Sequence, residues 1–147
     1  MKTSVTLLIF YILILLCNGC SPYKKLEKTD HLPTEYQGFF EDDYGISYQI
    51  DQEVFRLLPN DVYHIISWNP QQSYLLVQND TSNTYAPGLF GKIDIMDFQG
   101  MEPYEWGFCL IAYEAKNLQA AIQASSDRNN PKVGCNGFPF TRMKRKE

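Results

Sequence analysis

Beyond residue 37, apolar and polar residues alternate in short runs, which is the pattern of strands with one buried face. The clearest run is residues 46–51, ISYQID. It follows residues 41–45, EDDYG, which favour a turn. The pattern predicts six or seven antiparallel strands in all. Besides 46–51, they are expected at 54–58, 62–68, 74–78, 90–98, 107–113 and 138–141, each bounded by residues that favour turns.

One segment has helical periodicity instead. Asn117 can cap its first turn, because the side-chain amide oxygen can accept a free backbone N–H. Residues 127–131, DRNNP, end the segment. The residues that fall on one helical face are Leu118, Ala121, Ile122 and Ser125. We therefore expect a mainly β fold: an antiparallel meander curled into a small barrel or sandwich, with one short helix near the C-terminus.

The N-terminal residues have a different character. Lys2 is followed by a nearly unbroken apolar run, residues 5–16, which is short for a membrane span and typical of an export signal. Gly19 and Cys20 follow, and a small residue before such a cysteine resembles the lipobox of bacterial lipoproteins. The lipobox favours leucine where this chain has Cys17. The alternatives are ordinary signal cleavage and a true membrane anchor.

The lipobox resemblance implies a domain organisation. Residues 1–19 would be removed, and Cys20 would carry the lipid that holds the protein in the bacterial cell envelope. A serine after the cysteine implies, by the same resemblance, the outer membrane. Residues 20–36 are polar and are expected to form a tether, 37–142 a single β-rich domain, and 143–147 a basic tail.

Charge and cysteine content narrow the classes of function. The formal net charge is −4, and nucleic-acid binding requires a basic face, so nucleic acid is not an expected partner. Apart from the two cysteines near the N-terminus, the chain has Cys109 and Cys135, and in an oxidising envelope this pair predicts a disulfide. The rival interpretation is a catalytic thiol with His31 or His64 as its base.

Candidate chemistry is otherwise sparse. The sequence contains no metal or cofactor motif, and no cofactor is expected. His64 lies in a strand-like segment, where a hydrogen-bonded structural role competes with a catalytic one. A carboxylate pair for glycoside hydrolysis could combine Asp42 or Asp43 with Asp94 or Asp97, although adjacent acids in a turn are usually solvated.

The longest polar interruption between apolar strands is residues 79–88, NDTSNTYAPG. Binding residues gather on loops held by a rigid scaffold, so Asn79, Asp80, Asn83 and Tyr85 form a candidate binding loop. The alternative is a structural connection in which Asn79 and Asp80 cap their own turn and Tyr85 packs on the barrel end. Oxygens of the first three residues could also bind calcium, although their spacing is not that of an EF-hand loop.

The chain from about residue 36 to 142 resembles, in collinear order, a family of small secreted or lipid-anchored bacterial domains without an established activity. It departs from the family at residues 92–98 and at Phe140, where the family often has tryptophan. The elements that carry the resemblance are DDYG at 42–45, YHI at 63–65, QND at 78–80, Tyr85 with PGLF at 87–90, FC at 108–109, AYEA at 112–115, DR at 127–128, GC at 134–135 and GFPFT at 137–141. The resemblance implies a fold and a location in the cell envelope, but it implies no reaction.

Two classes of function therefore stay open. The first is a non-catalytic envelope module that binds a protein, a glycan or a small amphiphile, or that only supports surface structure. The second is an envelope hydrolase with a carboxylate or His64 centre. The second would require a deep pocket that joins His64 to Asp42, Asp43 or Asp80.

Overall fold

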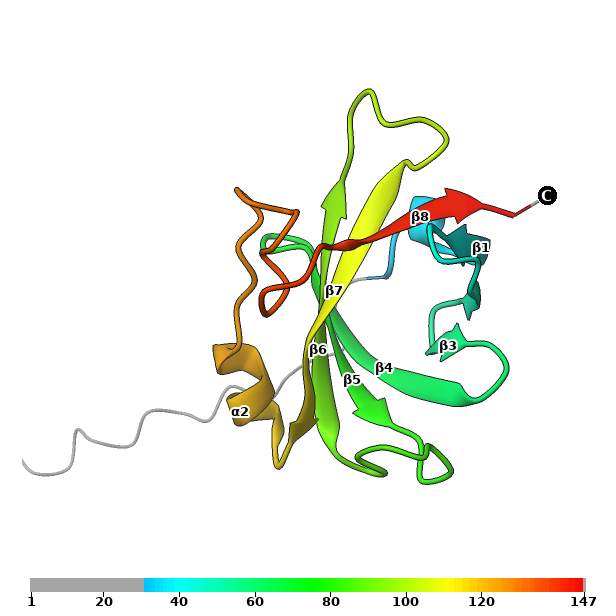
Figure 1. Cartoon of the computed structure of the whole chain (residues 1–147). Coiled ribbons are helices and arrows are strands. Elements are labelled where there is room, and N and C mark those ends of the chain that lie inside the picture. The colour runs from blue at the N-terminus through cyan, green and yellow to red at the C-terminus, as the bar shows by residue number, and fades with distance from the viewer. Residues whose placement is uncertain (1–30, 147) are drawn as a thin grey trace, which may run out of the picture.

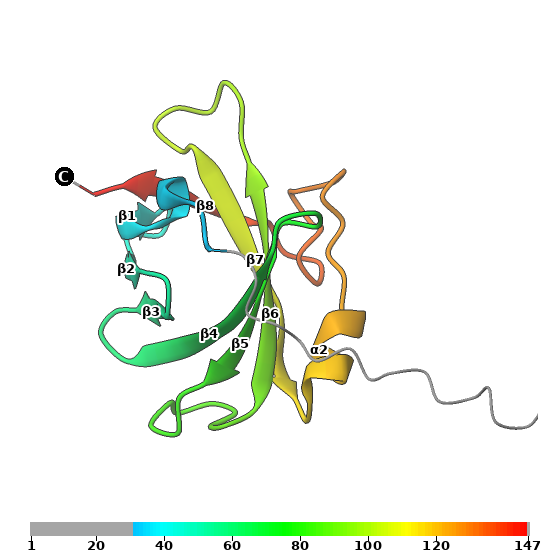
Figure 2. The same ribbon diagram turned by 180° about the vertical axis from the view of Figure 1, so that it is seen from behind.

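The computed structural model describes residues 31–146 and forms a closed antiparallel barrel in which each strand pairs with the next and β8 returns to β1 (Figures 1 and 2). The predicted mainly β meander with one late helix is confirmed, and of the two expected forms it is the barrel. The barrel has eight strands instead of the six or seven expected, because the first strand was not predicted. The strands are β1 (Gly38–Asp42), β2 (Ser47–Ile50), β3 (Val54–Leu57), β4 (Asp61–Asn69), β5 (Tyr74–Asn79), β6 (Phe90–Asp97), β7 (Trp106–Ala115) and β8 (Thr141–Arg145).

Strand length gives the barrel a tall side and a short side. β4 and β7 contain 9 and 10 residues, whereas β1, β2, β3 and β8 contain only 5, 4, 4 and 5. At roughly 3.3 Å of rise per residue, β7 is about twice as long as β1 or β8. β8 pairs with β7 only over residues 106–108, so the remainder of β7 runs on beyond its neighbour. The second half of β7 therefore extends past the last residue pair that it forms with β8.

Aromatic side chains fill one end of the barrel, which we call the closed end. The 3-10 helix η1 (Thr34–Tyr36) precedes β1, and the ring of Tyr36 lies 5.9 Å from that of Trp68 and 5.3 Å from that of Trp106. Leu32 is buried in the same cluster. The sequence-based tether therefore ends too late, because Leu32 and Tyr36 bury apolar surface inside the folded domain.

A second layer covers part of the barrel's outside. α2 (Leu118–Gln123) packs on β5, β6 and β7, and residues 124–140 continue along the same side (Figure 1). The predicted cap is confirmed, since the Asn117 side chain accepts a hydrogen bond from the Ala120 amide at 2.9 Å. Leu118, Ala121 and Ile122 face the barrel as expected, but Ser125 lies beyond the helix end. Within residues 31–146, no helix is long and apolar enough to cross a membrane.

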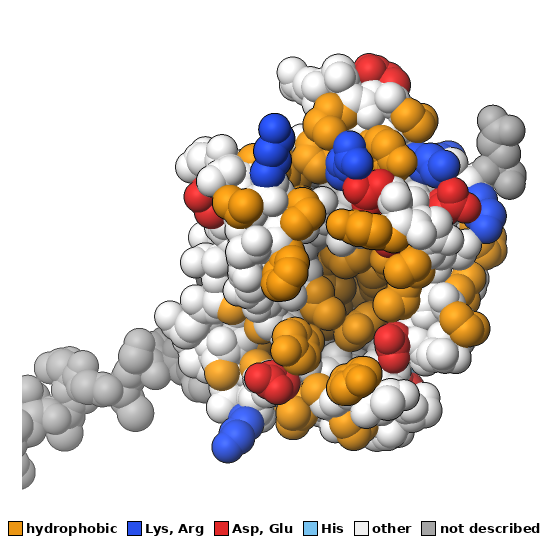
Figure 3. Space-filling model, viewed as in Figure 1, with side chains coloured by type: hydrophobic (Ala, Val, Ile, Leu, Met, Phe, Trp, Pro, Cys, Tyr) orange, Lys and Arg blue, Asp and Glu red, His pale blue; other side chains and the backbone are white. Residues whose placement is uncertain are grey.

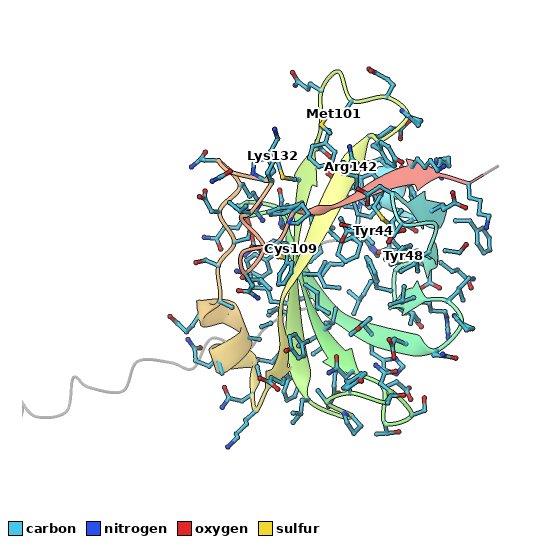
Figure 4. All side chains as sticks on the ribbon, viewed as in Figure 1. Tyr44, Tyr48, Met101, Cys109, Lys132 and Arg142 are labelled. Atoms are coloured by element: carbon cyan, nitrogen blue, oxygen red, sulfur yellow. A yellow bond between two sulfur atoms is a disulfide. The ribbon has the colours of Figure 1, made fainter. Side chains whose placement is uncertain are left out.

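The predicted disulfide joins this outer layer to the barrel. Cys109 of β7 and Cys135 are bonded, with Cα atoms 5.5 Å apart, and Cys109 is buried beside Ile111 and Phe140. Figure 4 shows Cys109 on β7. Both sulfurs are committed to the bridge, so the rival interpretation of a catalytic thiol does not hold for this structure.

The last strand lies later in the chain than the sequence indicated. A strand was expected at 138–141 and a basic tail at 143–147, whereas β8 spans Thr141–Arg145. Met143 points inward and is fully buried, while Lys144 on the other face pairs with Glu41 of β1 at 3.0 Å. The expected tail is therefore mostly barrel wall, because one buried methionine and cross-strand ion pairs hold it there.

Candidate functional site

The barrel is hollowed on the face shown in Figure 3, and hydrophobic side chains line the hollow. In the matching view of Figure 1, the hollow lies between β7 on one side and β3 and β4 on the other, below β8. This is the place where β7 runs on beyond β8. An eight-stranded barrel has an interior that is either filled by side chains or able to hold one small ligand. In this barrel one end is filled by aromatic side chains, and the face shown in Figure 3 is hollow.

We infer the lining from inward-facing side chains that keep some exposure on the strands that border the hollow. Leu57 of β3, Tyr63 of β4 and Leu110 of β7 are only partly buried and pack against the core cluster. Ile65 and Phe108 are 8 % and 9 % exposed, the highest fractions among the buried members of that cluster. We call these five side chains the apolar lining.

Two phenols give this apolar lining a polar element. Burial, with a smaller effect of Asp61, raises the pKa of the Tyr63 hydroxyl to about 12. The hydroxyl of Tyr48, which Figure 4 labels, donates a 2.8 Å hydrogen bond to Asp42. Burial also raises the pKa of Tyr48. Both phenols are therefore neutral at physiological pH. Unlike Tyr48, Tyr63 makes no side-chain hydrogen bond within the part of the chain that the structure describes.

His64 lies on the outer face of β4, away from this lining. Its Nε2 atom is 2.6 Å from Oδ2 of Asp80, and about half of the His64 side chain is exposed. The backbone amide of Ser82, together with the Ser82 hydroxyl and the His64 ring, holds the pKa of the Asp80 carboxyl well below its usual range. The carboxylate stands between the other two groups. A nucleophilic triad needs the imidazole in that middle position, so His64 is not placed to take a proton from Ser82.

The other acids of the catalytic hypotheses are held by different partners. Asp42 accepts hydrogen bonds from the amides of residues 44 and 46, and Asp43 pairs with Arg142 at 2.8 Å. Asp94 pairs with Lys92 on the barrel's outside, whereas Asp97 accepts from the hydroxyl of Tyr36. Of the acids proposed to join His64, the structure brings Asp80 to it and holds Asp42 and Asp43 elsewhere. Within residues 31–146, no three His, Cys, Asp or Glu side chains are grouped so as to hold a metal ion.

Most polar side chains of the candidate binding loop are hydrogen-bonded to backbone groups of the protein itself. Asn79 is buried and donates to the carbonyls of Ala86 and Tyr113, and Asn83 bonds both the N–H and the C=O of Val62. Tyr85 is 79 % exposed. The alternative in which Tyr85 packs on the barrel end is therefore wrong, while the turn-capping role expected for Asn79 and Asp80 is confirmed. Recognition of a partner by this loop stays a prediction that would rest on Tyr85.

Sequence reasoning did not identify the apolar lining as a site. Each of its members occupies an inward position of a strand, and a filled core gives the same alternation. Only the unequal lengths of the strands could have suggested an opening. The sequence pattern did not give the lengths of β1 and β8, because it predicted no strand at β1 and placed the last strand too early in the chain. Cys20, the predicted lipidation site, lies outside the described residues. Comparison of the chain with protein-family models, curated proteins and solved structures gives no match.

Proposed function

We propose that this protein is a bacterial envelope lipoprotein whose barrel binds an amphiphile with a single acyl chain. The observation that carries the proposal is the open hollow with its apolar lining. Transfer of a chain from water into contact with such side chains contributes roughly 0.8 kcal/mol per buried CH₂ group. An open mouth leaves one end of the ligand in water, so that end must be polar.

Tyr63 supports the polar end of this ligand. Its ring belongs to the apolar lining, while its hydroxyl is free within the described residues to bind a head-group oxygen. The aromatic rings of Tyr36, Trp68 and Trp106 fill the closed end, so the chain would enter only part of the barrel. A protein with these features is a carrier or sensor of a lipid rather than a hydrolase.

The test uses cis-parinaric acid, a fatty acid whose fluorescence rises in an apolar site, with protein expressed from residue 21 and therefore without a lipid. We expect saturable binding that palmitate displaces. Leu57→Glu places a charge in the apolar lining, and a loss of about 1.4 kcal/mol or more would lower the affinity at least tenfold. The matched control is Leu58→Glu, because Leu58 is the next residue and is exposed. Binding that is absent in the wild type, or equal in the two variants, would refute the proposal.

The lipid anchor is a separate part of the proposal and has its own prediction. Cys20→Ala removes the thiol that would receive the lipid, so the variant should lose metabolic labelling by a fatty-acid analogue and stay uncleaved or leave the membrane. Cys17→Ala is the matched control, since Cys17 would lie in the discarded signal, and it should still be labelled. Label retained by Cys20→Ala would exclude a lipid at this position.

A further inference from the structure

The inward side chains of β7 follow a fixed order from the closed end of the barrel to the hollow. Trp106 belongs to the closed end, where its ring lies 5.3 Å from that of Tyr36. Leu110, further along the strand, belongs to the apolar lining. Phe108 lies between them on the same face, because side chains two residues apart in a strand point to the same side. The ring of Phe108 therefore lies between the closed end and the part of the barrel that a ligand would enter.

The inward side chains of β4 repeat this order on the other side of the hollow. Trp68 lies in the closed end beside Tyr36, whereas Tyr63 belongs to the apolar lining. Ile65 lies between them, and a β-bulge after it returns Trp68 to the inner face. Both long strands therefore place one level of side chains between the closed end and the outer part of the lining.

Three aromatic rings fill this intermediate level. The ring of Phe108 lies 5.6 Å from that of Tyr48 in β2 and 5.1 Å from that of Phe55 in β3. The rings of Tyr48 and Phe55 lie 5.8 Å apart, and all three pairs meet edge to face, an arrangement that aromatic rings prefer. Phe55 also lies 6.4 Å from Tyr63 of the lining. We call Tyr48, Phe55 and Phe108 the aromatic floor, because a chain that follows the lining inward meets these rings before the closed end.

Phe108 is the most exposed member of the aromatic floor. Tyr48 and Phe55 are almost fully buried, and the hydroxyl of Tyr48 is fixed by its hydrogen bond to Asp42. Phe108 keeps a larger exposed fraction than either of them. It is also the last residue of β7 that pairs with β8, and the hollow lies where β7 runs on beyond that pair. The end of a bound chain would therefore contact Phe108 first.

We propose that Phe108 sets the length of the acyl chain that the barrel accepts. This inference rests on the proposed function of the hollow. Each CH₂ group adds to the affinity only while it leaves water for apolar contact, so CH₂ groups for which the floor leaves no room add nothing. The affinity for saturated fatty acids should therefore rise with chain length and then level off. A smaller side chain at this position opens a way toward the closed end, and a larger one shortens the site.

The experiment measures displacement of cis-parinaric acid by saturated fatty acids from octanoate to stearate. The barrel closes within residues 31–146, so protein expressed from residue 21 keeps all of it. Phe108→Ala should move the levelling of affinity to longer chains. The affinity for stearate relative to laurate should rise about tenfold, which corresponds to about two further CH₂ groups in apolar contact. Phe108→Trp should move the levelling to shorter chains.

The matched control is Phe140→Ala, which removes the same ring from the outer layer. Phe140 is buried beside Cys109, outside the core cluster that contains the aromatic floor. Its truncation should lower the melting temperature but leave the chain-length profile unchanged. If Phe108→Ala does not fold, Phe108→Leu takes its place, because leucine keeps a smaller apolar side chain there and should move the profile in the same direction.

The outcomes separate this inference from the function on which it rests. If no fatty acid displaces the probe from the wild type, then the proposed function and the inference both fail. If the wild type binds fatty acids but the folded Phe108 variants keep its chain-length profile, then only the inference fails. A profile that Phe140→Ala shifts as much as Phe108→Ala would also overturn it, since the shift would then follow from lost stability.

Discussion

Replacement of Cys109 and Cys135 by alanine should lower the free energy of unfolding by about 3–4 kcal/mol, because the bridge closes a loop between residues 26 apart in the chain. That loop contains α2 and the outer segment, so the segment should also become more accessible. Urea denaturation of the double variant, followed by tryptophan fluorescence, gives the free energy.

The wild type under reducing conditions is the matched control for the double variant. If the bridge itself supplies the stability, then reduced wild type and the oxidised double variant should unfold at nearly the same urea concentration. A midpoint of the double variant equal to that of the oxidised wild type would show that the outer layer is held by its hydrogen bonds and apolar contacts alone.

Trp106→Ala should cost about 3–5 kcal/mol, as do other truncations of large buried aromatics. Trp106 is 2 % exposed at the closed end of the barrel, and its ring lies 5.3 Å from that of Tyr36 and 5.1 Å from that of Phe40. Its indole nitrogen has no hydrogen-bond partner among the described residues, so the packing of the ring is what the barrel would lose. Thermal unfolding by circular dichroism measures the effect.

Phe39→Ala provides the comparison for Trp106→Ala. Phe39 precedes Phe40 in β1, faces the other way and is 55 % exposed, so its truncation should change the stability by no more than about 0.5 kcal/mol. Equal losses in the two variants would mean that the aromatic cluster is not what closes this end. Trp106→Phe should lose less than Trp106→Ala, because the phenyl ring retains part of the same contact.

The local pattern of apolar and polar residues was enough to predict most of the fold. Alternation located the strands from β2 to β7. Each of them has one face inside the barrel, so its apolar residues recur every second position in the sequence. Asn117 located the start of α2, since a cap is a local interaction between a side chain and the next turn. The closed end was missed, because within residues 31–36 only Leu32 and Tyr36 are buried, and they form no periodic pattern.

The features that were missed depend on contacts between distant segments. Lys92 and Asp94 occupy outward positions of β6, where solvent would be the ordinary surrounding, and they are buried only because residues 124–128 cross above them. The apolar lining likewise borders a hollow at the place where the pairing of β7 with β8 stops, at Phe108 and Thr141. The disulfide was predictable without such knowledge, since the count of cysteines and the expected oxidising compartment were enough.

The most direct test of the proposed function is to locate the acyl chain inside the barrel. Stearic acid that carries a nitroxide on its chain would be added to protein with labelled Ile, Leu and Val methyl groups, and the broadening of each methyl signal would be measured by NMR. We expect the signals of Leu57, Ile65 and Leu110 to broaden, while those of Ile122 and Val133 in the outer layer stay sharp. Sharp signals from the apolar lining at saturating ligand, or equal broadening of the outer methyl groups, would contradict a ligand in the hollow.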